Sequence, residues 1–525
     1  MGKGLFRRGL NAPQQQTLVL SISAFFTATL LLGMISIVLL IFARGGGYFW
    51  PEDLYRLELI TPGSATPTPA YGEYHGPFQQ NDETRHWVVY SHQQNPYGER
   101  VLITTAELNQ ARLAKNAARV LLQDGRTILG RPEVIKKAGT EAQPLTRLAD
   151  YQQQVESLSQ QIKQIRDGHL AELHRQIRDM AAAGSTASQR TLDAKRRAFE
   201  HWQGKIRQLE TARDKYTITV VLADNSQIQI PLSQIEQLIY PGQLHAGTKL
   251  LVALDKVWRF LTEAPKQANT AGGIFPALFG TVLMVFLMTL IVTPFGVLAA
   301  VYLHEYAPQN ALTTTIRIAV TNMAGVPSIV YGVFGLGFFI YGVGGQLDSW
   351  FFADALPAPT LGTPGVFWAA LTMAILTLPV VIVATEEGLR NVPADIKAGS
   401  YALGATKAET MIHTVLPMAS PGIMTGVILA IARAAGEVAP LMLVGAVKFA
   451  PNLPIDGEFP FLHLERQFMH LGVLIYDGAF HSQVDTSGAS MMFAACLLLL
   501  VVVFVLNIIA VVLRNRLRQR YQKGG

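Results

Sequence analysis

The sequence predicts an all-α membrane protein with six transmembrane helices, into which an α+β domain is inserted. The first observation is composition: of 525 residues, 50% are hydrophobic and only 15% are charged, which is too apolar for an ordinary soluble protein. The second is that several apolar runs reach the roughly 20 residues that a helix needs to cross a bilayer. The third is a long polar stretch between the first of these runs and the second.

The predicted spans are the apolar runs at 17–43, 276–303, 316–341, 366–385, 422–447 and 489–513. The first of them follows basic residues, as a signal peptide would. It is longer than the apolar segment of a signal peptide, about 7 to 15 residues, and it has no convincing cleavage site. We therefore predict a retained membrane anchor.

The orientation of the chain follows from its basic residues, since Lys and Arg in short loops are retained on the cytoplasmic side. Both tails, 1–16 and 514–525, are basic, the loop 342–365 has no Lys or Arg, and the loop 386–421 carries Arg390, Lys397 and Lys407. Both termini are thus predicted to be cytoplasmic, with residues of about 45–275 and the loop 448–488 in the periplasm. Basic clusters beside apolar spans are orientation signals, so we expect no nucleic-acid partner.

The polar insertion at 44–272 is long enough to be a domain. Strand-like segments occur around 86–104 and 216–232, the latter a hairpin that turns at Asp224 and Asn225. Apolar residues at helical spacing predict a helical hairpin or short coiled coil at about 146–213, with a phase slip at Gly168 and a turn at 181–188. Heptad spacing specifies how helices pack and does not identify a binding partner. The predicted hairpin is therefore consistent with a scaffold and with an arm that docks a partner.

Motifs for enzyme chemistry are missing. The chain has no GxxxxGK[ST] loop for nucleotide phosphates and no HExxH or GxSxG motif. We therefore predict no catalytic residue, no metal site and no cofactor in this chain; if ATP powers its action, another subunit hydrolyses the ATP. His304 and His413 stand alone near predicted membrane ends, where an interfacial role is expected, and Cys496 is the single cysteine.

The most specific pattern is "AGSYALGATKAETMIHTVLPMASPG" at 398–422. It resembles the signature of ABC transporter permeases: EAA, three residues, Gly, nine residues, Ile, any residue, Leu-Pro. Gly404 fills the glycine position and Leu416-Pro417 the closing pair, whereas Ala398, Gly399 and Ser400 replace EAA and Thr414 replaces Ile. Glycine permits a sharp turn between two short helices. In this family the resemblance implies a loop that docks on the ATPase subunit.

The segments "GGIFPALFGTVLMVFLMTLIVTPFGVLAAVYLHEYA", "GVPSIVYGVFGLG", "TEEGLRNVPADIKAGSYALGATK" and "ARAAGEVAPL" resemble permease subunits of phosphate ABC importers, over residues 273–447. The resemblance implies a type I importer (MetI-like) permease fold in a bacterial inner membrane. The implied partners are a homologous second permease subunit, an ATPase dimer that uses ATP and magnesium, a periplasmic phosphate-binding protein, phosphate and membrane lipid. The resemblance does not extend to the insertion.

Arg433 and Glu437 are predicted near the middle of the fifth span. A charge at the bilayer centre costs about 2.5 to 3.5 kcal/mol even on the cheapest scale, so such residues are expected to be functional. Four residues apart on one helix they can pair, and arginine's fork of donors matches an oxyanion. We predict a substrate pathway lined by Arg433 and Glu437; a purely structural ion pair is the alternative.

Two further residues are assigned to this pathway. Pro327 and Ser328 lie early in the predicted third span, where proline frees a carbonyl. The glycines Gly332, Gly335 and Gly337 that follow are expected to allow close helix packing.

The function expected from these features is transport of inorganic phosphate, with two alternatives. One keeps the fold and changes the cargo to another oxyanion, sulfate or molybdate. The other is a membrane-anchored sensor or scaffold without transport activity. A secondary transporter is disfavoured because the loop at 398–422 would then have no purpose.

Overall fold

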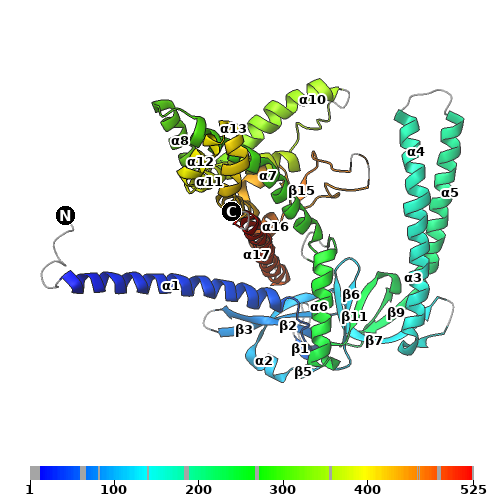
Figure 1. The fold of residues 1–525 in the computed structure, drawn as a ribbon. Helices are drawn as coiled ribbons and strands as arrows, with labels where there is room; N and C mark the ends of the chain where they lie inside the picture. The colour runs from blue at the N-terminus through cyan, green and yellow to red at the C-terminus, as the bar shows by residue number, and fades with distance from the viewer. Residues whose placement is uncertain are drawn as a thin grey trace. The chain divides into compact units, whose positions relative to one another are not determined.

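The structure is a computed structural model, drawn as a ribbon in Figure 1, and describes residues 12–59, 67–80, 83–138, 141–182, 189–266, 271–353, 357–457, 459, 461–481 and 486–522. The chain forms two compact units. The membrane unit comprises Met1–Phe49 and Val257–Gly525, and the inserted unit comprises Trp50–Lys256. The inserted unit is thus shorter at both ends than the predicted insertion at 44–272. The N-terminal basic residues and most of the predicted turn at 181–188 lie outside the described residues.

Six helices in the described part of the chain are long and apolar enough to cross a membrane. They are Gln16–Gly47 (in α1, Ala12–Gly47), Phe275–Tyr306 (α7, Phe275–Val301, with a π-helical end Tyr302–Tyr306), Ser328–Phe351 (α9 to α10), Val366–Arg390 (α11), Lys407–Gly436 (α13 to α14) and Met491–Arg516 (in α17, Thr486–Gln522). Four agree with the predicted runs to within a few residues. The third and fifth do not.

The predicted third span, 316–341, is wrong at its start because it joins two helices. α8 (Ala311–Met323) ends before the segment 324–327, and the spanning helix begins at Ser328, running through α9 (Ser328–Phe334) and a π-helical stretch (Gly335–Gly344) to α10 (Gly345–Phe351). Pro327 is the N-cap residue of α9, with extended backbone at φ −55° and ψ 134°. Proline starts this helix, where no amide donor is needed, and removes no bond inside it.

The predicted fifth span, 422–447, is also wrong. The helix begins earlier, with α13 (Lys407–Thr410) and a π-helical turn (Met411–Val415), and α14 (Leu416–Gly436) ends before Glu437. Glu437 has an extended backbone, φ −78° and ψ 134°, and a separate short helix, α15 (Ala439–Val444), follows with proline in its first turn. The apolar run is therefore broken where its charged residues lie.

The core of the membrane unit surrounds α11. Of the most apolar window of α11, 67% is buried, against 28% or less for the other spans. Glycines bring its neighbours close: a Cβ on Gly422 of α14 would lie 2.5 Å from the Cα of Gly388 on α11, a contact that only small residues permit. α1 packs against α17, where Gly45 meets the backbone of Phe493.

Short elements connect the later spans. β14 (Ala446–Val447) pairs in parallel with β15 (Phe468–Met469), and α16 (Leu471–His481) follows before α17. Before α7, the two-residue strands β12 (Pro265–Lys266) and β13 (Ala271–Gly272) pair with each other.

The inserted unit contains two antiparallel sheets, so its predicted strands are present. One sheet has the order β4-β3-β2-β1-β5 and the other the order β10-β9-β7-β6-β11, with β8 pairing β7. The strands are β1 (Leu54–Leu59), β2 (Thr68–Gln80), β3 (Glu83–Ser91), β4 (Glu99–Thr104), β5 (Arg112–Leu113), β6 (Ala118–Leu122), β7 (Thr127–Lys137), β8 (Gln143–Pro144), β9 (Tyr216–Val221), β10 (Gln227–Pro231) and β11 (Ile235–Ile239). A short helix, α2 (Thr105–Gln110), follows β4. Asn225 makes the predicted turn with φ 65°.

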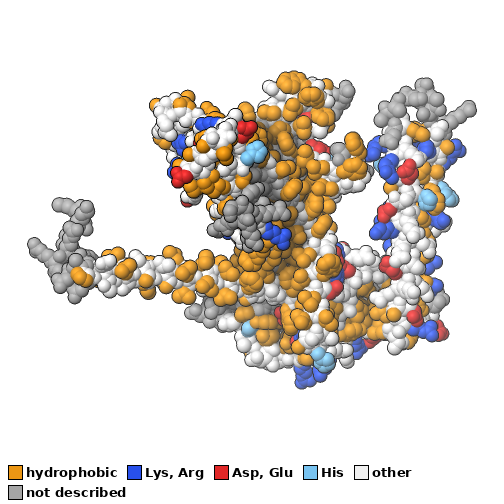
Figure 2. Space-filling view, viewed as in Figure 1, with side chains coloured by type: hydrophobic (Ala, Val, Ile, Leu, Met, Phe, Trp, Pro, Cys, Tyr) orange, Lys and Arg blue, Asp and Glu red, His pale blue; other side chains and the backbone are white. Residues whose placement is uncertain are grey.

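A helical arm extends from between β8 and β9 (Figure 1). It consists of α3 (Leu148–Gln164), a π-helical segment (Ile165–Leu170), α4 (Ala171–Ala182) and α5 (Gln189–Arg213). The extra residue of the π-helical turn lies where the apolar spacing slips at Gly168. Figure 2 shows charged side chains along this arm, whereas apolar side chains cover α1 and the spans.

Candidate functional site

The signature loop forms a compact helical turn around Gly404. α12 (Ala394–Ala402) leads into the turn, Gly404 has φ +86°, and Thr406 begins α13. Thr406 and Glu409 form a capping box in which each side chain accepts the other residue's backbone amide, satisfying donors at the helix start. We call residues 394–410 the Gly404 turn. Glycine allows its left-handed backbone without a Cβ penalty.

The residues of the signature motif occupy different places in this turn. Ala398, Gly399 and Ser400 lie on α12, and Ser400 Oγ is 2.8 Å from Thr410 Oγ1, which joins the two sides of the turn. Leu416 and Pro417 are not part of the loop: they form the first turn of α14. Because the π-helical turn Met411–Val415 leads directly into α14, Pro417 lies within the continuous helix Lys407–Gly436, where it has no backbone amide to donate.

An apolar side chain projects from the tip of the turn. Leu403, next to Gly404, is 91% exposed, although leucine normally lies in a protein interior. Behind the turn, Met411 and Val415 are buried against Leu389 and Val392. The base of the turn is therefore packed, and its tip offers an apolar side chain to a partner.

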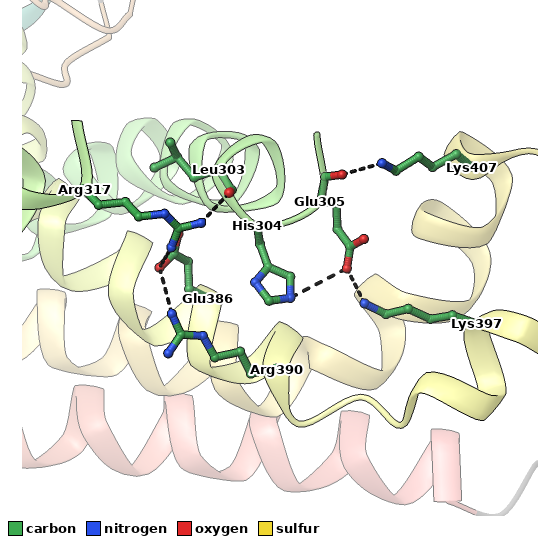
Figure 3. Close-up of polar contacts among 8 residues, drawn as sticks. All are labelled: Leu303, His304, Glu305, Arg317, Glu386, Arg390, Lys397 and Lys407. Carbon is green, nitrogen blue, oxygen red and sulfur yellow. Dashed lines mark hydrogen bonds and ion pairs between the residues drawn. The ribbon is translucent and has the colours of Figure 1, made fainter. Parts of the chain in front are cut away.

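Ion pairs attach the turn to the end of α7 (Figure 3). The ammonium group of Lys397 on α12 binds the carboxylate of Glu305, in the π-helical end of that span. Lys407 donates to the backbone carbonyl of Glu305, and its Nζ lies 4.5 Å from the centre of the Tyr306 ring. The side chains of Glu305 and Lys397 are only 14% and 19% exposed. Charge-assisted bonds with limited solvent access are stronger than surface pairs.

A second group of charges joins α8 to α11 beside the first (Figure 3). Arg317 on α8 lies 3.0 Å from Glu386 on α11 and donates to the backbone carbonyl of Leu303, and Arg390 lies 3.9 Å from the same glutamate. Glu386 thus pairs with two arginines, one on α8 and one four residues further along its own helix. Together the two groups connect the Gly404 turn with α7, α8 and α11.

Two members of these groups, Glu305 and Arg317, were missed by sequence reasoning. They lie far along the chain from their partners, and only the fold brings them together. A signal existed at Glu305, an acidic residue at the end of an apolar span and beside His304, whose Nε2 lies 3.7 Å from its carboxylate. The described residues contain no group of three metal-ligating side chains.

Arg433 and Glu437 pair in the structure, but not on one helix. Nε of Arg433 lies 3.7 Å from Oε1 of Glu437. Arg433 lies in the last turn of α14 and Glu437 is the C-cap residue beyond it. The C-terminal end of a helix carries partial negative charge, which favours the cation of Arg433 in this last turn. Their side chains are 31% and 21% exposed.

The two helix breaks adjoin each other. α9 and α15, which follow the breaks, pack closely: a Cβ on Gly332 would lie 2.7 Å from the Cα of Pro440. The hydroxyl of Tyr331 donates to the carbonyl of Met323 at 2.7 Å and so bridges the break before Pro327 and Ser328. Of the predicted packing glycines, Gly332 and Gly335 are confirmed, whereas Gly337 has nothing within 4 Å of its Cβ position.

This site lies within the part of the chain that matches a known family. The family model described as binding-protein-dependent transport system inner membrane component matches residues 292–519. Phosphate transport system permease protein PstA 1 of Mycobacterium tuberculosis (strain CDC 1551 / Oshkosh) is 33% identical over 245 residues, which cover 46% of this chain and 71% of that protein. A probable ABC transporter permease protein, YqgI of Bacillus subtilis (strain 168), is 33% identical over 204 residues, covering 39% and 63%.

Among solved structures, a chain of the inward-facing MetNI methionine ABC transporter matches at 16% identity and a TM-score of 0.35, covering 50% of this chain and 98% of that chain. The match of the sequence, rather than this weak structural likeness, defines the family. The inserted unit lies outside the residues that the family model matches. The chain belongs to the binding-protein-dependent transport system inner membrane components and, among them, to the PstA-type ABC permeases, with six apolar helices of the MetI-like permease fold.

Proposed function

We propose that this chain is the membrane-spanning subunit of an ATP-driven importer that moves inorganic phosphate across the inner membrane into the cytoplasm. The single observation that carries the proposal is the Gly404 turn: an exposed Leu403 at its tip and ion pairs from its base to the end of a span. The name of the PstA 1 relative supports phosphate as cargo. The YqgI relative's name specifies no cargo.

In the proposed orientation, the Gly404 turn and both termini face the cytoplasm, and residues of about 45–275 lie in the periplasm. The distribution of Lys and Arg supports it, since the turn carries Lys397 and Lys407 and the loop 342–365 carries neither residue type. The turn would then be on the side where ATP is available.

The coupling that we propose is mechanical. Leu403 would seat in an apolar cleft of an ATPase subunit, and the pairing of Lys397 with Glu305 would pass the movement of the turn to α7. Partly buried ion pairs can transmit force because breaking them leaves a charge uncompensated. ATP and magnesium would be used by a separate ATPase dimer (PstB-like), and this chain would contribute no catalytic residue.

Two further partners complete the proposed importer. A homologous second permease subunit (PstC-like) would form the other half of the pathway, and a periplasmic phosphate-binding protein (PstS-like) would deliver the anion. The family description, which names dependence on a binding protein, supports the latter kind of partner.

The proposed substrate pathway passes the breaks at Glu437 and Pro327. Discontinuous helices place free backbone groups and charges inside a membrane protein, where transported ions bind. Arg433 would attract phosphate with a permanent charge and a fork of donors, while Glu437 would offset part of that charge so that the anion is released.

Uptake of labelled phosphate tests the proposal. Cells that lack their own copy of this subunit would be complemented with the wild-type chain or with Arg433→Gln, at matched membrane levels and with excess sulfate or molybdate as competitors. We expect the wild type to restore ATP-dependent uptake that only phosphate competes away, and Arg433→Gln to reduce it at least tenfold, about 1.4 kcal/mol.

Other results would point elsewhere. Competition by sulfate or molybdate would favour another oxyanion as cargo. A wild-type chain that reaches the membrane and restores no uptake would favour the sensor or scaffold. Normal transport by Arg433→Gln would make the Arg433–Glu437 pair structural.

A further inference from the structure

The last turn of α7 is π-helical, which changes the hydrogen bonding of the Leu303 carbonyl. The amide of Ala307 bonds to the carbonyl of Tyr302 at 2.8 Å, five residues back. In an α-helix the same amide would bond to the carbonyl of Leu303. The next amide of a π-helical ladder would come from residue 308, which is a proline and has none. The π-helical turn therefore leaves the Leu303 carbonyl without an amide from the residues four and five positions later.

Arg317 supplies the missing donor from outside the helix (Figure 3). Its guanidinium donates to the Leu303 carbonyl and also to the carboxylate of Glu386, where Nη1 lies 3.2 Å from Oε2. The planar fork of arginine suits two acceptors at once. Glu386 belongs to α11, the most buried of the spans, and its side chain is only 13% exposed. The core of the membrane unit thereby holds Arg317 in place.

With Arg317 in this position, the π-helical turn loses no hydrogen bond. A charge-assisted bond pairs the Leu303 carbonyl, and a cation is favoured at the negative C-terminal end of α7. Without Arg317, the π-helical turn would leave that carbonyl unpaired, whereas an α-helical turn would pair it with the amide of Ala307. Because Leu303 is buried, an unpaired carbonyl there is unfavourable. The α-helical turn would then be preferred.

The form of this turn decides the direction of Glu305. An α-helical turn holds about 3.6 residues and a π-helical turn holds more, so rewinding would rotate the last residues of the turn about the axis of α7. Glu305 is one of these residues. In the π-helical form its carboxylate binds Lys397 of the Gly404 turn, and its backbone carbonyl accepts from Lys407. Both contacts therefore depend on the π-helical form.

We propose that Arg317 is a positioning residue for the coupling of this chain to its ATPase. By binding the Leu303 carbonyl it holds the end of α7 in the π-helical form, which keeps Glu305 directed at Lys397. The inference rests on the proposed function, in which the Lys397–Glu305 pair passes the movement of the Gly404 turn to α7. Arg317 acts on that pair through the backbone of α7 and needs no contact with the transported anion.

Zero-length crosslinking of the full chain in lipid nanodiscs tests the inference. A water-soluble carbodiimide joins a carboxylate to an amine in contact with it, so the yield of the Glu305–Lys397 crosslink, quantified by mass spectrometry, measures how often this pair is formed. The Lys448–Asp477 pair, 2.7 Å apart, is the reference in the same molecules. We expect Arg317→Met to lower the ratio of the two yields roughly fivefold or more, as the loss of one hydrogen bond would.

The matched control is Arg390→Met. Arg390 pairs with the same Glu386 at 3.9 Å, whereas the bond to the Leu303 carbonyl comes from Arg317. Arg390→Met should therefore leave the ratio at its wild-type value. An unchanged ratio in Arg317→Met would overturn the inference, and so would an equal fall in Arg390→Met, because loss of charge beside Glu386 would then be sufficient. Loss of folded protein lowers both crosslinks alike, so the ratio reports the folded molecules.

A second measurement relates the direction of Glu305 to transport. In proteoliposomes that hold the chain with its companion permease subunit, the ATPase and a binding protein, Arg317→Met should lower the phosphate taken up per ATP hydrolysed roughly fivefold or more. Unchanged uptake per ATP together with a lost crosslink would overturn the role in coupling. Failure of the proposed function is distinguishable, because wild-type proteoliposomes would then take up no phosphate with ATP, while the crosslinks of the chain in nanodiscs would be unaffected.

Discussion

At the scale of single residues, Lys256 lies in a site that disfavours the charged form of its side chain. Burial, and next the positive charge of Arg119, lower the pKa of Lys256 from its usual 10.5 to about 7, against the attraction of Glu73 and Glu52. In the unfolded chain the pKa returns to its usual value. Between pH 7 and about 10 the unfolded state therefore binds more protons than the folded state, and the free energy of unfolding rises with pH.

We predict that the wild-type inserted unit becomes more stable between pH 7 and 9, by at most about 1.4 kcal/mol per pH unit, the slope of a single proton. Lys256→Met should remove this slope. The measurement is thermal proteolysis of the full chain in nanodiscs, following fragments of the inserted unit. Lys249→Met, a change on the same face of α6 (Ala246–Thr262), should retain the slope. A wild-type profile that is flat or falls over this range would contradict the assigned shift.

At the scale of elements, the sequence predicted which segments are helices better than where they end. Apolar runs report burial, and a run stays apolar across a break if both sides are buried. The breaks before Ser328 and after Gly436 depend on backbone hydrogen bonding, which hydropathy does not reveal. Pro327 and Pro440 were visible, and proline marks the first turn of a helix as well as a kink. The phase slip at Gly168 was predictable because heptad spacing records an inserted residue directly.

The candidate site likewise has one part that the sequence predicted and one part that it did not. The turn at Gly404 follows from local chemistry, a glycine between two helical segments with a capping residue after it, so the sequence was sufficient. The pairing of Lys397 with Glu305 joins residues from two elements that are remote in the chain. In the sequence Lys397 served only as an orientation signal and Glu305 was missed, because only the packing of the end of α7 against the turn makes them partners.

Replacing each of two glycines in the Gly404 turn by alanine should change the stability of the turn in opposite directions. Gly404 has φ +86° and Gly399 lies within α12, and neither Cβ position has an atom within 4 Å, so sterics do not decide. Gly404→Ala should destabilise the turn by about 1 kcal/mol through backbone strain, whereas Gly399→Ala should stabilise α12 by up to about 1 kcal/mol through helix propensity. Hydrogen exchange of residues 394–410 measures both. Faster exchange in both variants would refute the assigned backbone of the turn.

At the scale of the whole molecule, the two compact units separate the family's machinery from the insertion. The matched residues, 292–519, the Gly404 turn and the Arg433–Glu437 pair all belong to the membrane unit. Lys249 and Lys256, on the first part of α6, belong to the inserted unit, where Lys249 pairs with Asp53 and Lys256 interacts with Glu73 and Glu52. Losing the inserted unit would expose lysines to water, which is inexpensive for a charged group.

We therefore predict that replacing residues 51–245 with a long flexible Gly/Ser linker leaves ATPase binding intact and phosphate uptake within about threefold of wild type, roughly 0.7 kcal/mol in transition-state free energy. Copurification with the ATPase subunit and labelled-phosphate uptake at matched membrane levels are the two measurements. Leu403→Ser in the shortened chain is the control that should abolish ATPase binding. If the shortened chain inserts and binds the ATPase, and transport is still lost, the inserted unit is itself part of the transport cycle, and the division of labour argued from the two units is wrong.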